Sequence, residues 1–123
     1  MLVYMLAAGS WKERILFGFN NMQQGLGPAG GVVFGPSGDL YGTTEFGYKF
    51  GCPNAYSGCG NVFKLTLGGN ETIVGLNPGG GYHPAAGLVV DAKGNLYGTT
   101  RAGGDLKACP GYNGCGSIFE VSQ

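Results

Sequence analysis

Four cysteines lie in two close pairs, one pair in each half of the sequence. The pairs are Cys52 with Cys59 and Cys109 with Cys115, and each begins with Cys-Pro and ends with Gly-Cys-Gly. In a glycine-rich loop that lacks a core of its own, a short disulfide ring can hold the chain in place. A four-cysteine zinc site is the alternative, but these spacings are not those of close zinc knuckles. We therefore predict two local disulfides and an oxidising compartment.

Aromatic side chains gather in the same loop segments and in the segment before the second half. Aromatic rings on long loops of a rigid scaffold can stack on sugar rings or on apolar groups of a partner. The alternative is that these rings pack down and hold the glycine-rich loops in place. Our candidate ligand-binding residues are Phe46, Tyr48, Tyr56, Tyr82, His83 and Tyr112. Phe50 lies in the same loop as the first three of them.

The sequence contains no recognisable catalytic constellation. His83 is the only histidine, and a lone histidine without a neighbouring carboxylate is more often structural than catalytic. Glu45 and Asp105 lie on the same loops but at different positions, and no Ser/His/Asp or Cys/His arrangement accompanies them. The several carboxylates or amides needed to hold a metal cannot be assembled either. We name no catalytic residue, no metal site and no cofactor, and we expect an enzyme only if copies join to form a site.

The elements that must position these residues form a repeat. The segment GDLYGTT at 38–44 recurs as GNLYGTT at 94–100, an offset of 56 residues (97 − 41). The same offset relates 28–33 to 84–89 and 58–63 to 114–119. A repeat of this length with several short strands is typical of stacked sheet units, as in β-propellers. The 27 glycines fall at fixed places in the repeat, which indicates turns and close packing rather than a flexible chain.

Each repeat should contain four antiparallel strands. Alternating apolar residues and turn signals predict strands at 31–34, 39–44, 61–66 and 71–76, and again at 87–91, 95–100 and 117–122. Gly42 and Gly98 lie in mid-strand, where a missing side chain indicates that a ring or a neighbouring sheet lies close. Antiparallel order brings the cysteine-bearing loops and the crossovers to one end of the sheets, and the short turns to the other.

The second repeat lacks a fourth strand, and the amino-terminal region contains a candidate for it. We divide the single domain 1–123 into a surplus strand of a preceding repeat (1–10), a fourth strand with its crossover (11–30), a full repeat (31–86) and a repeat without its fourth strand (87–123). The predicted fold is all-β and propeller-like, with two four-stranded blades of about 56 residues and an amino-terminal strand at 11–19 that completes the last blade.

Two blades cannot close a ring, because each blade needs a neighbour on both faces. The chain is therefore either a fragment of a longer array or a unit that joins copies of itself head to tail, and three copies are the favoured number. The surplus strand at 1–6 competes with 117–122 for one position beside the fourth strand. We expect it to be displaced, frayed or used in a further contact.

The motifs also carry a family resemblance. The pattern GLVVDxxGNLYGTT at 87–100, followed by GCGxIF at 114–119, resembles the GloVer tandem repeat of bacterial choice-of-anchor proteins, and the match covers nearly the whole chain. More loosely, PxxGLVVDxxGNLY at 84–97 is similar to the blades of NHL-type propellers. The resemblance implies a propeller-like all-β fold and an exported, surface-associated setting.

Composition excludes several partners. Seven Lys and Arg residues balance seven Asp and Glu residues, and charged residues make up 11% of the chain. Because no basic stripe is present to neutralise phosphates, we expect no nucleic-acid partner. No apolar run is long enough to span a bilayer. Residues 1–8 are apolar but lack the basic region and the length of a signal peptide.

These observations favour a non-enzymatic extracellular or cell-surface module that binds or acts as a scaffold, with glycan as the favoured ligand class. Two alternatives stay open. One is a self-assembling ring or filament without a small ligand. The other is a propeller-type hydrolase or lyase whose site forms when copies associate.

Overall fold

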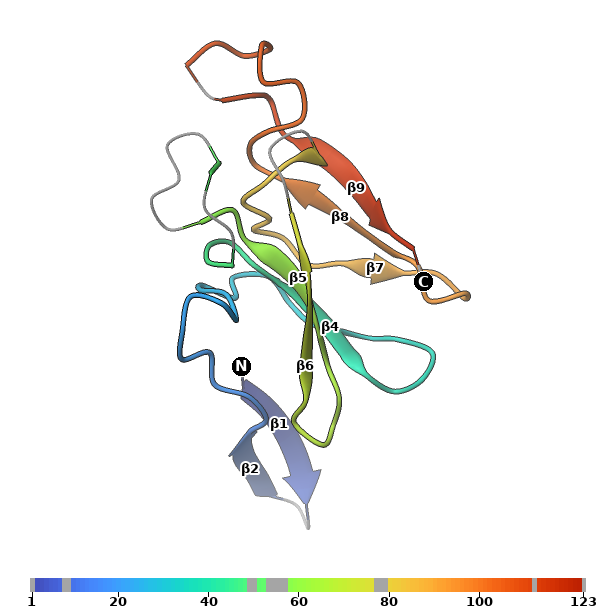
Figure 1. The fold of residues 1–123 in the computed structure, drawn as a ribbon. Coiled ribbons are helices and arrows are strands. Elements are labelled where there is room, and N and C mark those ends of the chain that lie inside the picture. The colour runs from blue at the N-terminus through green and yellow to red at the C-terminus, as the bar shows by residue number, and fades with distance from the viewer. Residues whose placement is uncertain are drawn as a thin grey trace.

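The computed structural model describes residues 2–7, 10–48, 51–52, 58–76, 80–111 and 113–122. These residues form β-strands, turns and loops and include no α-helix. As Figure 1 shows, the strands make a hairpin, a four-stranded sheet and a three-stranded sheet. The all-β class predicted from the sequence is confirmed, and no sheet closes on itself among the described residues.

The four-stranded sheet, called here the first sheet, contains the full repeat. Its strands are β3 (Val33–Phe34), β4 (Leu40–Thr44), β5 (Asn61–Leu65) and β6 (Glu71–Gly75). They pair in the order β3-β4-β5-β6, each antiparallel to the next. All four lie within the ranges predicted from the alternating pattern, and the outermost residues of those ranges lie outside the strands.

The three-stranded sheet, called here the second sheet, repeats this pairing. Its strands are β7 (Val89–Val90), β8 (Leu96–Thr100) and β9 (Ser117–Val121). The pair Leu40–Leu65 recurs as Leu96–Val121, and every other β4–β5 pair recurs between β8 and β9 at the same offset of 56. Over the described residues, no strand pairs with the free edge of β9.

The amino-terminal strands differ from our prediction. β1 (Leu2–Ala7) and β2 (Ser10–Ile15) form their own antiparallel hairpin, so β1 is neither displaced nor unpaired, and β2 already has one partner. β2 also ends at Ile15, whereas the predicted strand continued to residue 19. The physical reason is that two strands separated by only two residues in the sequence pair at little cost in loop entropy.

The two sheets stack, and the main core lies between them. Tyr41 and Val62 on the first sheet face Leu88 and Leu96 on the second, and Leu76 fills the end of the same cluster. Because strand side chains alternate between faces, the opposite face of the first sheet presents a second apolar set. That set, Leu40, Phe63 and Leu65, packs against Leu16, Phe17 and Phe19, the segment after the hairpin.

The mid-strand glycines have the role that the sequence predicted. A Cβ atom at Gly42 would lie 2.5 Å from the ring of Phe63, and one at Gly98 would lie 2.6 Å from the ring of Phe119. Phe63 is the cross-strand partner of Gly42, and Phe119 is the partner of Gly98. In each sheet, a phenylalanine ring therefore occupies the space beside a glycine that a Cβ atom would need.

Candidate functional site

Both predicted disulfides are present, and their surroundings differ. Cys52 bonds to Cys59 and Cys109 bonds to Cys115, with Cα–Cα distances of 5.6 and 5.4 Å. Cys52 and Cys59 are buried and pack against Tyr82, whereas Cys109 and Cys115 are exposed. The two bonds therefore close equivalent loops, but only the first of them belongs to a core.

Three of the candidate ligand-binding rings pack against one another. The ring of His83 lies between those of Phe46 and Tyr82, with centroid distances of 4.9 and 4.8 Å and edge-to-face geometry. The Tyr82 side chain is only 1% exposed. Its backbone pairs with Ala102, as Leu26 pairs with Phe46 one repeat earlier. Tyr82 therefore offers no free ring face to a sugar.

Of the other aromatic candidates, the structure describes Tyr48. Tyr48 is half-buried, and its ring covers Gly75, where a Cβ atom would be in steric conflict with it. Phe50, Tyr56 and Tyr112 lie outside the described residues.

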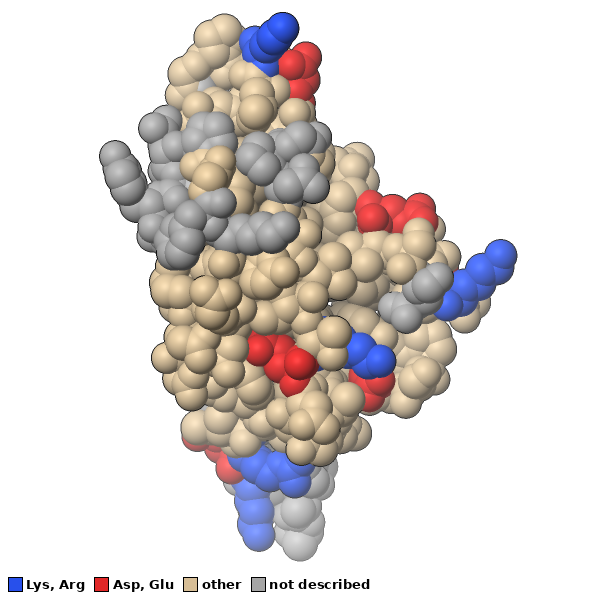
Figure 2. All heavy atoms as spheres, viewed as in Figure 1, with Lys and Arg blue, Asp and Glu red and all other residues tan. Residues whose placement is uncertain are grey.

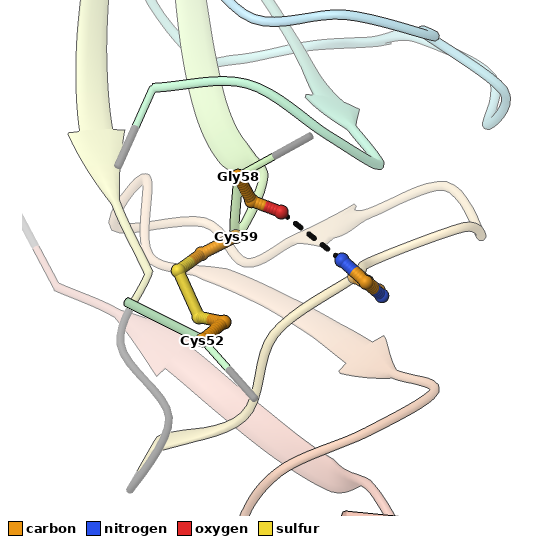
Figure 3. The surroundings of a disulfide bond; sticks show 4 residues. Cys52, Gly58 and Cys59 are labelled. Atoms are coloured by element: carbon orange, nitrogen blue, oxygen red, sulfur yellow. Dashed lines mark hydrogen bonds between the residues drawn. A yellow bond between two sulfur atoms is a disulfide. The ribbon is translucent and has the colours of Figure 1, made fainter. Parts of the chain in front are cut away.

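His83 connects the loop ends of the two sheets. Its backbone N–H donates to the Cys59 carbonyl at 2.9 Å, and its carbonyl accepts from the Arg101 N–H at 3.1 Å. Its Nε2 lies 3.1 Å from the Gly58 carbonyl oxygen, the dashed contact beside the Cys52–Cys59 disulfide in Figure 3. A carbonyl can only accept, so Nε2 must carry the proton. These contacts give the lone histidine a structural role.

The two loop carboxylates have different partners. The Glu45 carboxylate forms an ion pair with the Arg101 guanidinium. Asp105 accepts a hydrogen bond from the Lys107 N–H at 2.9 Å, which stabilises its own turn. Among the described residues, no three His, Cys, Asp or Glu side chains gather as they would around a metal ion.

One carboxylate escaped the sequence analysis. Glu71 begins β6, and its Oε1 is buried without a hydrogen-bond partner among the described atoms. Burial raises the pKa of this carboxyl to about 7. The alternation of β6 contained the signal, because Glu71 shares a face with Ile73 and pairs across the sheet with Leu65.

The outer face of the second sheet, formed by Val89, Thr99 and Ile118, is open. Ile118 is 83% exposed and Val89 is 68% exposed. Their counterparts one repeat earlier, Val62 and Val33, pack between the two sheets, where Val62 is only 2% exposed. The same apolar pattern is thus covered on the first sheet and uncovered on the second.

The far face of the first sheet is open only around β3, because residues 16–19 of the same chain cover Leu40, Phe63 and Leu65. Val32 and Phe34 are 36% and 63% exposed. Their counterparts, Leu88 and Val90, belong to the core between the sheets. One end of the stack therefore exposes one side of the interface that the chain buries at its centre, and the other end exposes only the part of the opposite side around β3.

The free edge of β9 borders a hollow. The space between the outer strands of the two sheets measures about 270 Å³ and is lined by Val62, Thr72, Val74, Val121 and Ser122, among others. Val74 on β6 is 44% exposed there. In the first sheet, β6 occupies the equivalent edge position beside β5.

No family model, no curated protein and no solved structure matches this chain. In the part of the chain that the structure describes, no helix is long and apolar enough to cross a membrane.

Proposed function

We propose that this chain is a non-enzymatic scaffold module that assembles head to tail with copies of itself. The observation that carries the proposal is the open outer face of the second sheet, together with the exposed residues around β3 on the far face of the first sheet. At one end, Ile118 and Val89 are exposed, although the equivalent residues one repeat earlier pack against Leu88 and Val90 inside the chain. At the other end, Val32 and Phe34 are exposed, although they are equivalent to Leu88 and Val90. The outer face of one copy should therefore pack around β3 on the far face of the next, beside residues 16–19, which already cover the rest of that face.

The shape of the stack supports a propeller-like assembly. The sheets approach closely beside β3 and β7, where the Thr43 hydroxyl donates to the Ala86 carbonyl at 3.1 Å. A Cβ atom at Gly30 would lie 2.6 Å from the Ala86 backbone. The hollow, in contrast, lies at the β6 and β9 side. Wedge-shaped stacking of this kind closes into a ring when it is repeated, commonly with about four to eight blades.

Completion of the last blade is part of the proposal. The free edge of β9 needs a fourth strand, and residues 11–19 of the next copy are our candidate. Residues Leu16, Phe17 and Phe19 already pack on the first sheet of their own chain. To pair with β9 of a neighbour, β2 must either keep β1 on one edge and pair with β9 along its other edge, or release β1 and pair with β9 in its place.

The proposed setting is extracellular or at the cell surface. Two disulfides in a small domain persist in oxidising compartments, and the GloVer-like motifs agree with export. Glycan binding is not part of this proposal, because the His83 ring packs against those of Phe46 and Tyr82.

The test is the oligomeric state of two matched variants. Ile118→Lys places a charge on the outer face, and Leu67→Lys places one on a similarly apolar, exposed residue in the β5–β6 turn. Sedimentation velocity should show the assembled form for the wild type and Leu67→Lys, and smaller species for Ile118→Lys with an unchanged circular dichroism spectrum. Equal sedimentation of all three proteins as monomers would refute the proposal.

A further inference from the structure

Glu45 and Arg101 occupy the same position of the repeat and carry opposite charges. They are 56 residues apart and form an ion pair that connects the first sheet to the second. The Glu45 side chain, which contacts the second sheet through Arg101, is 13% exposed, whereas the Arg101 side chain is 67% exposed. Arg101 therefore lies where the next sheet of a stack would cover it.

The backbone holds these two residues in equivalent ways. The Glu45 N–H donates to the Gly27 carbonyl at 3.0 Å, and the Arg101 N–H donates to the His83 carbonyl, one repeat later, at 3.1 Å. Just before them, the Thr44 and Thr100 hydroxyls donate to the carbonyls of Phe46 and Ala102 at 3.0 and 2.9 Å. The geometry that brings Arg101 to Glu45 would therefore bring the same position of a third sheet to Arg101.

We infer that this position determines which sheet packs on the outer face: Arg101 forms an ion pair with Glu45 of a second copy, so that the first sheet of that copy packs there. The inference rests on the proposed head-to-tail assembly. Charges at this position then alternate around the assembly. Joining two second sheets would place Arg101 against Arg101, and like charges across an interface disfavour the wrong partner.

Few other charges compete with this ion pair. Figure 2 shows a face on which charged side chains lie singly or in small groups on a largely uncharged surface. The junction between two copies also cannot have the same geometry as the junction between the two sheets of one chain. Ala86 is equivalent to Gly30 in the repeat and carries a Cβ atom where Gly30 has none. The backbones must therefore lie further apart at that point, and the charge pair spans the junction from its loop end.

A charge exchange tests the inference. The double variant E45R/R101E restores the pair within the chain and between its own copies, so it should assemble as the wild type does. Mixed with fluorescently labelled wild type, it should form mixed assemblies about ten-fold less than unlabelled wild type does, because Arg then meets Arg and Glu meets Glu. High salt should reduce this discrimination.

Each other outcome is decisive. Free mixing of the two assembled proteins would overturn the charge inference and leave head-to-tail assembly intact. A wild type that is monomeric would overturn both. If E45R/R101E does not fold by circular dichroism, the shorter variant E45K/R101D carries the same comparison.

Discussion

Ile118 occupies the place in the second sheet that Val62 occupies in the first, yet Val62 is 2% exposed and Ile118 is 83% exposed. Both residues face the same direction along the stack, since Thr43–Val62 and Thr99–Ile118 are equivalent cross-strand pairs. The difference arises because the second sheet covers Val62, whereas none of the residues that the structure describes covers Ile118. The same apolar face is thus buried on the first sheet and exposed on the second, and this difference is the basis of the proposed assembly.

The two disulfides should be reduced in sequence. Cys109 and Cys115 are exposed, whereas Cys52 and Cys59 are buried against Tyr82, so a reductant reaches the second loop first. Alkylation during a titration with a soluble phosphine, read by peptide mass spectrometry, should label Cys109 and Cys115 before the other pair. Labelling in the opposite order would show that the first loop opens readily.

Glu71 should make stability depend on pH. Its carboxyl has a pKa of 4.5 when unperturbed and about 7 in the folded chain. The folded state therefore holds the proton more tightly, and stability is greatest below pH 4.5 and falls as pH rises through about 7. With allowance for partial exposure, we expect a loss of about 1 kcal/mol.

The matched variant Glu71→Gln removes that titration. Urea unfolding of Glu71→Gln should show a flatter pH profile over the same window and greater stability than wild type above pH 7. Parallel profiles for the two proteins would mean that the carboxyl is solvated in the folded state.

Gly42 should not tolerate a side chain, whereas Gly31 should. A Cβ atom at Gly42 would lie 2.5 Å from the Phe63 ring, and one at Gly31 would meet nothing within 4 Å. We expect Gly42→Ala to lower the free energy of unfolding by about 2 kcal/mol through overpacking. Gly31→Ala should change it by less than about 0.5 kcal/mol. Equal effects would show that the ring moves aside.

Tyr82 should matter for stability. Because its ring is buried with a disulfide and with His83, Tyr82→Ala should cost about 3 kcal/mol in chemical denaturation. Leu67→Ala, a truncation in an exposed turn, is the control and should cost little. If Tyr82→Ala left the stability unchanged, the ring would be available for ligand binding, and a glycan array would become the next experiment.

The repeat made most of the fold predictable. GDLYGTT and GNLYGTT predicted β4 and β8, and a shared offset placed their partners β5 and β9. The mid-strand glycines and the local disulfides were also predictable, because each depends on residues close in the sequence or directly across a strand pair.

Longer-range relationships were not predictable. No pattern shows that the crossover before the second sheet carries Tyr82 into a core, since that depends on backbone bonds to Ala102. The hairpin of β1 and β2 was missed because pairing between strands that are close in the sequence outweighed the repeat pattern. The partnership of Glu45 and Arg101 needed the stacking geometry, although their equivalent positions were visible in the sequence.

The most direct test of head-to-tail assembly is the mass of the wild-type protein in solution, measured by size-exclusion chromatography with multi-angle light scattering. One chain has a mass of 12.6 kDa. We predict a closed assembly of three chains, in which six sheets form the ring and both open faces are covered. A folded protein that keeps the mass of a single chain at all concentrations would contradict the account.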